Sequence, residues 1–316
     1  MIELIIPASI FAGSLVLLAT SSHFTVRSLE KLMALTGLSE ISAGFAILAV
    51  MTSTPEITVA IFSVLEGTPG ITVGDVLGSN VFNLGAVIGM LGMLGYLKTC
   101  CTTLWMELTD ILFVTSLIPL LLVISHFHIF EVSSPIVGAI LLATFITNIY
   151  YMSRKGTPKN QASMSRKVEK QGTTRIIAKL LISFAGVVVA ARLVVSYGID
   201  IAGLLGVPPI LVGAKLISIG TSLPELTVDF TAVRRGRVHL AIGDIIGSNL
   251  TNLTLVLGLV LLTSPFAVDM TIFTEMLPFL LITTIIFWRF LTRGGVSQVG
   301  GMILMMVYIL FQAVIV

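Results

Sequence analysis

Long apolar stretches alternate with short polar segments along almost the whole chain. Ten such stretches lie near residues 4–20, 41–65, 71–96, 106–124, 132–152, 176–196, 208–232, 238–263, 270–289 and 300–316. Each is close to the roughly 20 residues that an α-helix needs to cross a bilayer. The pattern predicts an all-α integral membrane protein with ten transmembrane helices, five in a first half at 1–152 and five in a second half at 176–316. A polar linker at 153–175 separates the halves.

The composition agrees with a membrane protein. Of the 316 residues, 56% are hydrophobic and only 11% are charged, whereas a water-soluble domain has about 25% charged residues. The net charge of +2 is too small to indicate a nucleic-acid partner, so the expected surroundings are the lipid bilayer. Because ten helices use nearly the whole length, no separate catalytic domain is expected. We therefore expect a functional monomer that is not an enzyme and holds no cofactor.

Basic residues fall in alternate loops. They are Arg27, Lys31, Lys98, the linker residues Arg154, Lys155, Lys159, Arg166, Lys167, Lys170 and Arg175, and then Arg234, Arg235, Arg237, Arg289 and Arg293. The intervening loops, near 66–70, 125–131, 197–207 and 264–269, contain no Lys or Arg. Because basic loops stay on the cytoplasmic side, we expect a multi-pass protein of the cell membrane. Its linker should lie in the cytoplasm and both termini outside.

The chain is internally duplicated. The segment Thr52-Ser53-Thr54-Pro55-Glu56 returns as Thr221-Ser222-Leu223-Pro224-Glu225. At this offset of 169 residues, the segments 37–90 and 206–259 are identical at 20 of 54 positions. A repeat with an odd number of membrane spans must be inverted relative to its copy. We therefore expect two inverted five-helix repeats with a functional site where they meet.

Each repeat places a proline and a carboxylate inside an apolar run. Proline has no N–H and its ring crowds the carbonyl four residues earlier, so the carbonyls of Met51 and Gly220 should lose their helical partners. The charge of Glu56 or Glu225 costs about 2.5 to 3.5 kcal/mol at the centre of a bilayer. Freed carbonyls beside a costly carboxylate indicate that each broken helix binds a cation.

Neutral oxygen atoms surround the two glutamates in sequence. They belong to Thr52, Ser53, Ser79 and Asn83 in the first repeat and to Thr221, Ser222, Ser248 and Asn252 in the second. Ser79 and Asn83 are four residues apart and so share one helix face, as do Ser248 and Asn252. Carboxylate, hydroxyl, amide and carbonyl oxygens without thiols or imidazoles suit a hard cation, and six to eight of them suit Ca²⁺ better than Mg²⁺.

Three further acidic residues are open to more than one interpretation. Asp75 and Asp244 each lie one helical turn before the serine of the Gly-Ser-Asn motif. They could line the two mouths of an ion path, carry protons, or cap neighbouring helices. Asp229 has only Ala60 as its counterpart in the first repeat, so we expect it to pair with the arginines at 234–235.

The paired motifs carry a family resemblance. T-S-T-P-E followed by G-S-N-V-F-N, and G-T-S-L-P-E followed by G-S-N-L-T-N, resemble the two alpha-repeats of prokaryotic members of the calcium/cation antiporter superfamily. This superfamily includes the sodium/calcium and proton/calcium exchangers. The resemblance implies that Glu56 and Glu225 ligate Ca²⁺ with help from the neighbouring Thr, Ser and Asn. Sodium-coupled members commonly have Asp in place of Asn252, and several relatives have Asn at the positions of Asp75 and Asp244.

The expected function is extrusion of Ca²⁺ from the cytoplasm in exchange for a monovalent cation, by alternating access. If Glu56 and Glu225 are the only carboxylates of the site, one Ca²⁺, two protons or two Na⁺ balance their charge, whereas three Na⁺ would leave an excess of positive charge. Two carboxylates brought close together should also bind a proton more readily than isolated ones. On that count we favour H⁺ as the counter-ion and keep a Na⁺/Ca²⁺ exchanger with the same site as the alternative. A Ca²⁺ channel would also use carboxylates, but two broken helices at one site favour occlusion and exchange.

Overall fold

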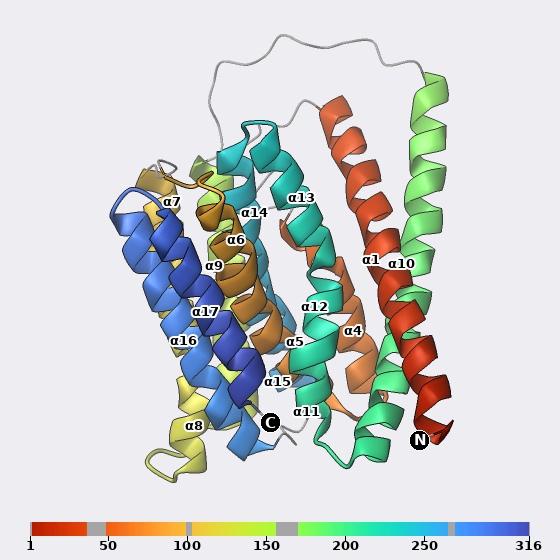
Figure 1. Ribbon diagram of the computed structural model, residues 1–316, viewed down its shortest axis with the longest axis vertical. Coiled ribbons are helices and arrows are strands. Elements are labelled where there is room, and N and C mark those ends of the chain that lie inside the picture. Colours follow the sequence, from red (N-terminus) through yellow and green to blue (C-terminus); the bar gives the residue numbers. More distant parts are fainter. Residues whose placement is uncertain (1, 37–48, 99–102, 156–169, 265–268, 316) are drawn as a thin grey trace.

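The computed structural model describes residues 2–36, 49–98, 103–155, 170–264 and 269–315, and within these ranges every regular element is a helix (Figure 1). In the first half the helices are α1 (Ile2–Thr36), α3 (Ala49–Thr52), α4 (Thr54–Leu65), α5 (Pro69–Val81), η2 (Phe82–Val87), α6 (Ile88–Met93), α7 (Thr103–Leu117), α8 (Leu120–His126) and α9 (Ser134–Lys155). In the second half they are α10 (Lys170–Leu205), α11 (Pro209–Val212), η3 (Gly213–Ile217), α12 (Ser218–Thr221), α13 (Leu223–Arg234), α14 (Val238–Thr251), η4 (Asn252–Val256), α15 (Leu257–Thr263), α16 (Met270–Thr292) and α17 (Gln298–Val314).

Several consecutive helices continue into one another, and together they form helical segments that are long enough to cross a membrane, which we call rods. Eight rods meet the length and hydropathy of a membrane span, and the shorter apolar helices Thr54–Leu65 and Gln298–Val314 add two more hydrophobic segments. The prediction of an all-helical membrane protein is therefore confirmed for the described residues. Ten spans were predicted and eight meet these limits among the described residues. Residues 41–48 of the predicted span 41–65 lie outside the described part of the chain, and α17, with 17 residues, falls just below the length limit.

The predicted ends of two helices are wrong. α1 continues to Thr36, well beyond the predicted end near residue 20, and α10 occupies 170–205 where 176–196 was predicted. Hydropathy detects only the apolar part of a helix, whereas the helix itself continues into polar sequence. α9 likewise reaches Lys155, so both ends of the predicted linker are helical, and residues 156–169 lie outside the described part of the chain.

Among the described residues, the turns that carry basic residues lie at one end of the bundle, where α1 and α6 end and where α13 turns into α14 (Figure 1). We call this the basic end, defined by Arg27, Lys31, Lys98, Arg234, Arg235, Arg237, Arg289 and Arg293. α1 begins and α17 finishes at the opposite end of the bundle (Figure 1). The alternation of charge along the sequence thus becomes a separation of charge between the two ends of the molecule.

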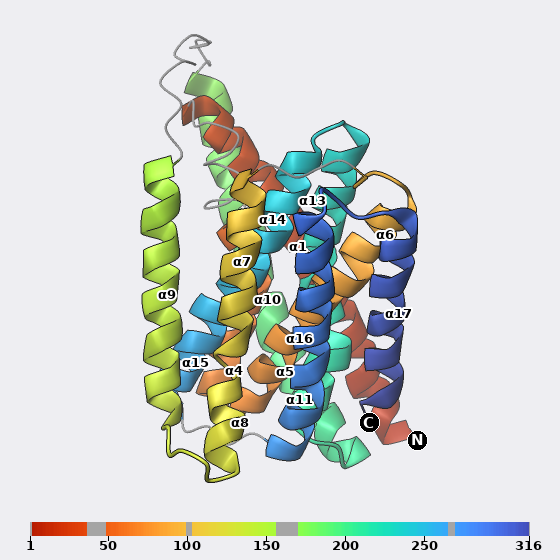
Figure 2. The same ribbon diagram turned by 90° about the vertical axis from the view of Figure 1, so that its left-hand side faces the viewer.

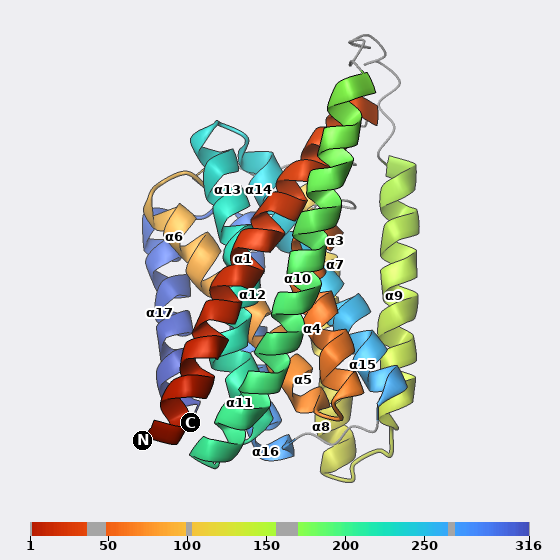
Figure 3. The same ribbon diagram turned by 90° about the vertical axis from the view of Figure 1, so that its right-hand side faces the viewer.

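The candidate membrane spans differ strongly in burial, and those that carry the duplicated Gly-Ser-Asn motifs lie at the centre of the bundle. In the rod Pro69–Met93, 89% of the span is buried, and in Val238–Thr263 the fraction is 83%, whereas the spans of α1 and α10 are only 17% buried. α1 and α10 pack against each other along one edge of the bundle (Figure 3). α9 stands at another edge, with α7 and α16 between it and α17 (Figure 2). Apolar side chains exposed on these outer helices suit contact with lipid.

Glycines allow the two halves to pack backbone against backbone. A Cβ at Gly74 of α5 would overlap the carbonyl oxygen of Ile210, and one at Gly213 would overlap the carbonyl oxygen of Ile71. Small residues at helix crossings allow this close approach in membrane proteins. The crossing holds α5 of the first half directly against α11, η3 and α12 of the second half, which brings the two repeats together at the site.

Candidate ion-binding site

Both predicted helix breaks are present. α3 ends at Thr52 and α4 begins at Thr54, with Pro55 in its first turn. In the second repeat α12 ends at Thr221 and α13 begins at Leu223, with Pro224 in its first turn. The residue between the helices is a serine in each case, so the hydroxyl groups expected near the cation lie directly at the breaks.

The structure completely buries the ten polar side chains of the predicted site. Glu56 and Glu225 have no exposed surface, and the same holds for all eight predicted neutral side chains, namely Thr52, Ser53, Ser79, Asn83, Thr221, Ser222, Ser248 and Asn252. Glu56 lies close enough to Glu225 and Asp75 for their charges to interact. The structure thus gathers residues from α3, α4, α5, η2 and from their counterparts in the second half. Of the two predicted carbonyl donors, Gly220 is buried and Met51 is half-buried.

A hydrogen-bonded group joins α5 to the second broken helix. Thr221 Oγ1 donates to Asp75 Oδ1 at 2.9 Å, and Ser79 Oγ donates to the same oxygen at 3.3 Å. The hydroxyl oxygens of Ser79 and Thr221 are themselves 3.3 Å apart. An aspartate of the first repeat therefore holds the threonine at the helix break of the second repeat.

The same arrangement occurs with the repeats exchanged. Thr52 Oγ1 donates to Asp244 Oδ1 at 3.1 Å and lies 2.8 Å from Ser248 Oγ. Ser248 Oγ also lies 3.5 Å from Glu225 Oε1. A hydroxyl has one proton and two lone pairs, so a threonine that gives its proton to an aspartate can turn its lone pairs towards a cation.

These contacts define what Asp75 and Asp244 do in this structure. Both side chains are fully buried and both accept a threonine hydroxyl from the opposite repeat. In this structure neither residue is exposed at a mouth of the bundle. Their geometry is that of groups that orient the hydroxyls beside the glutamates, and the predicted role in a proton or cation pathway stays a prediction.

Several buried oxygen atoms in the site accept no hydrogen bond from the described residues. They are both carboxylate oxygens of Glu56, Oε2 of Glu225, Oγ of Ser53 and Ser222, and Oδ1 of Asn83 and Asn252. Buried polar atoms are normally satisfied, and each exception needs an explanation. Among the described residues, no three Asp, Glu, His or Cys side chains lie close enough together to hold a metal ion. A cation here would therefore depend on hydroxyl, amide and backbone oxygens in addition to the carboxylates.

The prediction for Asp229 is wrong. Asp229 lies one helical turn after Glu225 on α13, is fully buried, and is near enough to Asp244 and Glu225 for their charges to interact. Neither of its carboxylate oxygens accepts a hydrogen bond from the described residues. The nearby Arg234 instead lies over the ring of Phe230, with its guanidinium carbon 5.7 Å from the ring centre. Asp229 is therefore a buried acid of the site region.

Among the described residues, the interior consequently holds five fully buried carboxylates, namely Glu56, Asp75, Glu225, Asp229 and Asp244. Glu56 and Glu225 are therefore not the only buried charges in the site region, because Asp75 and Asp244 each accept a hydroxyl from the opposite repeat and Asp229 is buried nearby. A balance of charge based on two carboxylates therefore no longer decides between H⁺ and Na⁺.

Two further features of the site were not predicted. Asn83 Nδ2 donates to Asn249 Oδ1 at 3.4 Å and so links the two repeats. Asn249 belongs to the second Gly-Ser-Asn motif but was not among the predicted site residues. The chain also forms wide π-helical turns at Phe82–Val87 and Asn252–Val256. Such turns are rare and occur frequently at functional sites, and here they include Asn83 and Asn252.

Comparisons with known proteins agree with this geometry. The family model described as sodium/calcium exchanger protein matches residues 6–154 and 176–316. Over 95% of its length the chain is 30% identical to sodium/calcium exchanger MaX1 of Methanosarcina acetivorans, of which it covers 96%. It is 28% identical over 94% of its length to putative antiporter CaxA of Alkalimonas amylolytica, of which it covers 95%.

A solved structure of the sodium-calcium exchanger NCX_Mj, soaked with 10 mM Na⁺ and zero Ca²⁺, superposes with a TM-score of 0.69 at 23% identity and covers 99% of this chain and 100% of the other. The fold is thus that of a membrane-embedded cation exchanger. The match of the family model to nearly the whole chain identifies the family. This chain belongs to the sodium/calcium exchanger family, and membership supports cation/Ca²⁺ antiport as its activity.

Proposed function

We propose that this protein extrudes Ca²⁺ from the cytoplasm in exchange for a monovalent cation, by alternating access between two inverted repeats of five transmembrane helices. In this proposal α4 and α17 complete the set of ten spans, the basic end faces the cytoplasm, and both termini lie outside. The segregation of basic turns at one end supports the orientation. The protein acts as a monomer in a cell membrane.

The observation that carries the proposal is the meeting of two broken helices at one buried set of oxygens. Glu56 and Glu225 lie at equivalent breaks, and each break carries a hydroxyl that is bonded to an aspartate of the other repeat. Buried carboxylates in the membrane are costly and mark ion pathways. A site built equally by both repeats can change its exposure when one repeat moves against the other.

Ca²⁺ is the cargo of this site. The carboxylates of Glu56 and Glu225 would bind it, and the hydroxyls of Thr52, Thr221, Ser79 and Ser248 would add neutral oxygens. Carbonyls of Met51 and Gly220 are further candidates, because the prolines remove their helical N–H partners. Hard oxygen donors of this kind in a flexible arrangement suit Ca²⁺. The poorly buried pair α1 and α10 would move to open the site to one side at a time.

Na⁺ is the counter-ion that we now favour. H⁺ was favoured on the assumption that two protons balance the charge of two carboxylates, and five buried carboxylates remove this assumption. Hydroxyl and amide oxygens are hard donors that suit Na⁺ as well as Ca²⁺. The relative MaX1, at 30% identity, is described as a sodium/calcium exchanger. H⁺ remains the second candidate, because the buried carboxylates of Asp229 and Asp244 lie near enough for their charges to interact, and such a pair needs a proton or a cation to be stable in a buried position.

The test separates the two gradients. Purified protein is reconstituted into proteoliposomes, and uptake of ⁴⁵Ca²⁺ is measured with an outward Na⁺ gradient at equal pH and, separately, with a pH gradient in Na⁺-free buffer. Sodium coupling predicts uptake in the first condition and none in the second. The reverse result would replace Na⁺ by H⁺, and uptake that needs neither gradient would reject exchange.

A further inference from the structure

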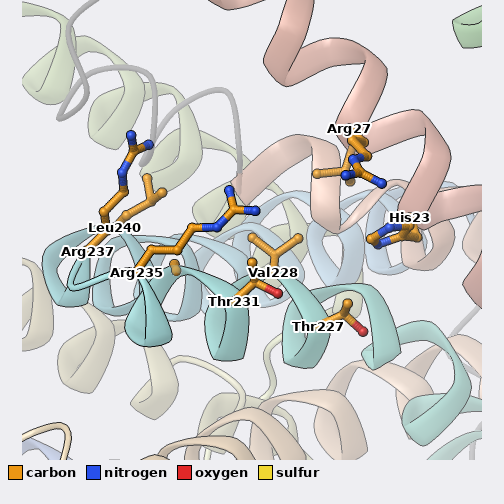
Figure 4. A pocket seen from close by; sticks show the side chains of 10 residues that line it. His23, Arg27, Thr227, Val228, Thr231, Arg235, Arg237 and Leu240 are labelled. Carbon is orange, nitrogen blue, oxygen red and sulfur yellow. The ribbon is translucent and has the colours of Figure 1, made fainter.

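A cavity of about 280 Å³ opens at the basic end, between α1 and α13 (Figure 4). His23 and Arg27 of α1 line one side, and Thr227 and Thr231 of α13 line the other. Arg235, in the turn after α13, extends towards Arg27 across the opening (Figure 4). The cavity is separate from the ion site, but α13 contributes to both.

The lining is strongly basic. Arg27, Arg235 and Arg237 surround the opening, and none of the described residues that line the cavity is acidic. His23 adds a buried Nδ1 atom that has no hydrogen-bond partner among the described residues. The guanidinium groups of Arg27 and Arg235 lie on two sides of the opening (Figure 4), and their planar donors match the oxygens of a phosphate. The cavity therefore suits a phosphate group.

A second cavity, of about 340 Å³, lies between α1 and α10. Its lining combines the apolar side chains of Phe24 and Ile176 with Lys31, Arg175 and Lys179, and it shares Arg27 with the first cavity. A lining that combines apolar side chains with cations suits the part of a phospholipid where acyl chains meet the headgroup. The two cavities thus flank the same end of α1 with basic groups.

The position of the cavities selects a lipid over other phosphates. Both lie at the end of an outer helix that carries exposed apolar side chains, among them Val16, Leu17 and Phe24. Basic pockets between transmembrane helices near the membrane surface bind the headgroups of anionic lipids. We propose that the cavity between α1 and α13 binds the phosphate of an anionic phospholipid and that this phosphate bridges Arg27 to Arg235.

The bridge would connect the outer pair of helices to the site helix. α1 packs mainly against α10 and also contacts α12 and α13, and α13 begins beside Glu225. A phosphate held by one arginine from α1 and one from the end of α13 would stabilise their contact. This inference concerns lipid binding and depends neither on the direction of transport nor on the counter-ion.

The test is lipid-dependent thermal stability of the purified full-length protein in a neutral detergent. Phosphatidylglycerol, phosphatidylcholine and inorganic phosphate are titrated separately, and the Tm is measured at each concentration. Binding to the folded state raises the Tm with ligand concentration. We expect phosphatidylglycerol to raise the Tm and phosphatidylcholine to leave it unchanged, with inorganic phosphate giving at most a small rise at millimolar concentration.

The variants Arg27→Gln and Arg235→Gln should each raise the concentration of phosphatidylglycerol needed for half of the shift by about tenfold, because each removes a charged hydrogen-bond donor. Arg289→Gln and Arg293→Gln are matched controls at the same end that do not line either cavity, and they should match the wild type. Arg235→Lys keeps the charge and should lie between the wild type and Arg235→Gln.

Two outcomes would overturn the proposal. Equal loss of the shift in the Arg289→Gln and Arg27→Gln variants would mean that general surface charge attracts the lipid. A full shift from inorganic phosphate, with no addition from phosphatidylglycerol, would mean that the cavity binds free phosphate. Because the arginines are exposed, the variants should fold, and their Tm without lipid provides the check.

Discussion

Thr221 and Thr52 offer a quantitative test of the site, because they hold equivalent positions in the two repeats. Substitution by Val keeps the shape of the side chain and removes only the hydroxyl. In Thr221→Val the bond to Asp75 at 2.9 Å is lost, and in Thr52→Val the bond to Asp244 at 3.1 Å is lost. Because the two contacts are equivalent, the two variants should have similar defects.

The magnitude follows from the type of bond. A hydrogen bond to a charged group contributes about 1.5 to 3 kcal/mol, and about 1.4 kcal/mol corresponds to a tenfold change in affinity. Each variant also removes an oxygen that the proposal assigns to Ca²⁺. We therefore expect each substitution to raise the KM for Ca²⁺ by about 10- to 100-fold.

The assay is initial ⁴⁵Ca²⁺ uptake as a function of Ca²⁺ concentration in proteoliposomes that contain equal amounts of protein. Thr58→Val is the matched control, because the Thr58 hydroxyl bonds only to the Thr54 carbonyl of its own helix, at 2.7 Å. Its KM should stay within about twofold of the wild type. Wild-type KM values in both Thr52→Val and Thr221→Val would refute the assigned roles of the hydroxyls.

Three other predictions address the acid, the packing and the topology. Asp229→Asn should change the dependence of uptake on the counter-ion, measured as the Na⁺ or H⁺ concentration for half-maximal rate, because one of two facing carboxylates loses its charge; an unchanged dependence would assign Asp229 a structural role. Gly74→Ala should lower the Tm by an amount equivalent to about 1 to 3 kcal/mol or prevent folding, because the new methyl group overlaps backbone atoms. The control is Gly13→Ala, which has no atom within 4 Å of the new Cβ and should leave the Tm unchanged or raise it. In a background without Cys100 and Cys101, a cysteine at Glu66 should react with an impermeant reagent only from outside and a cysteine at Arg293 only from the cytoplasm, and the opposite labelling would reverse the orientation.

The sequence predicts the helix breaks well because their cause is local. Pro55 and Pro224 each lack an N–H and so remove a helical hydrogen bond whatever packs against the helix. A serine stands two residues before each of them, whereas Pro278, which has no such serine before it, lies inside the continuous helix α16. The burial of Glu56 and Glu225 is predictable for a similar reason, since each lies within an apolar run and recurs at the same offset. In a single membrane helix, a functional polar residue cannot be told from an incidental one. The recurrence of the same residue in both repeats makes that distinction possible.

Asp229 shows where this reasoning fails. Comparison of the repeats gives weight to shared residues, and it gives none to Asp229 because the counterpart of Asp229 is Ala60. Its spacing of four residues from Glu225 does place both on one helix face, but only the packing of α13 against α14 shows that this face points inward. Charged neighbours in sequence, such as Arg234, are a poor guide when the helix turns them away.

The wide turns at Phe82–Val87 and Asn252–Val256 had no recognisable signal in the sequence. An extra residue in a helical turn depends on how neighbouring helices pack against it, and neither segment contains a proline. The link between Thr221 and Asp75 is equally invisible beforehand, because it depends on the crossing of α5 and α12. Tertiary contacts decide both features.

Glutamate-to-glutamine substitutions test the central claim most directly. Glu56→Gln and Glu225→Gln each keep the shape of the side chain and remove one negative charge from the buried site. The measurement is ⁴⁵Ca²⁺ uptake by proteoliposomes under an outward Na⁺ gradient, with the Tm of each variant recorded to show that it folds. The account predicts that each variant folds and that neither takes up Ca²⁺ above the background of empty liposomes; wild-type uptake by either folded variant would contradict it.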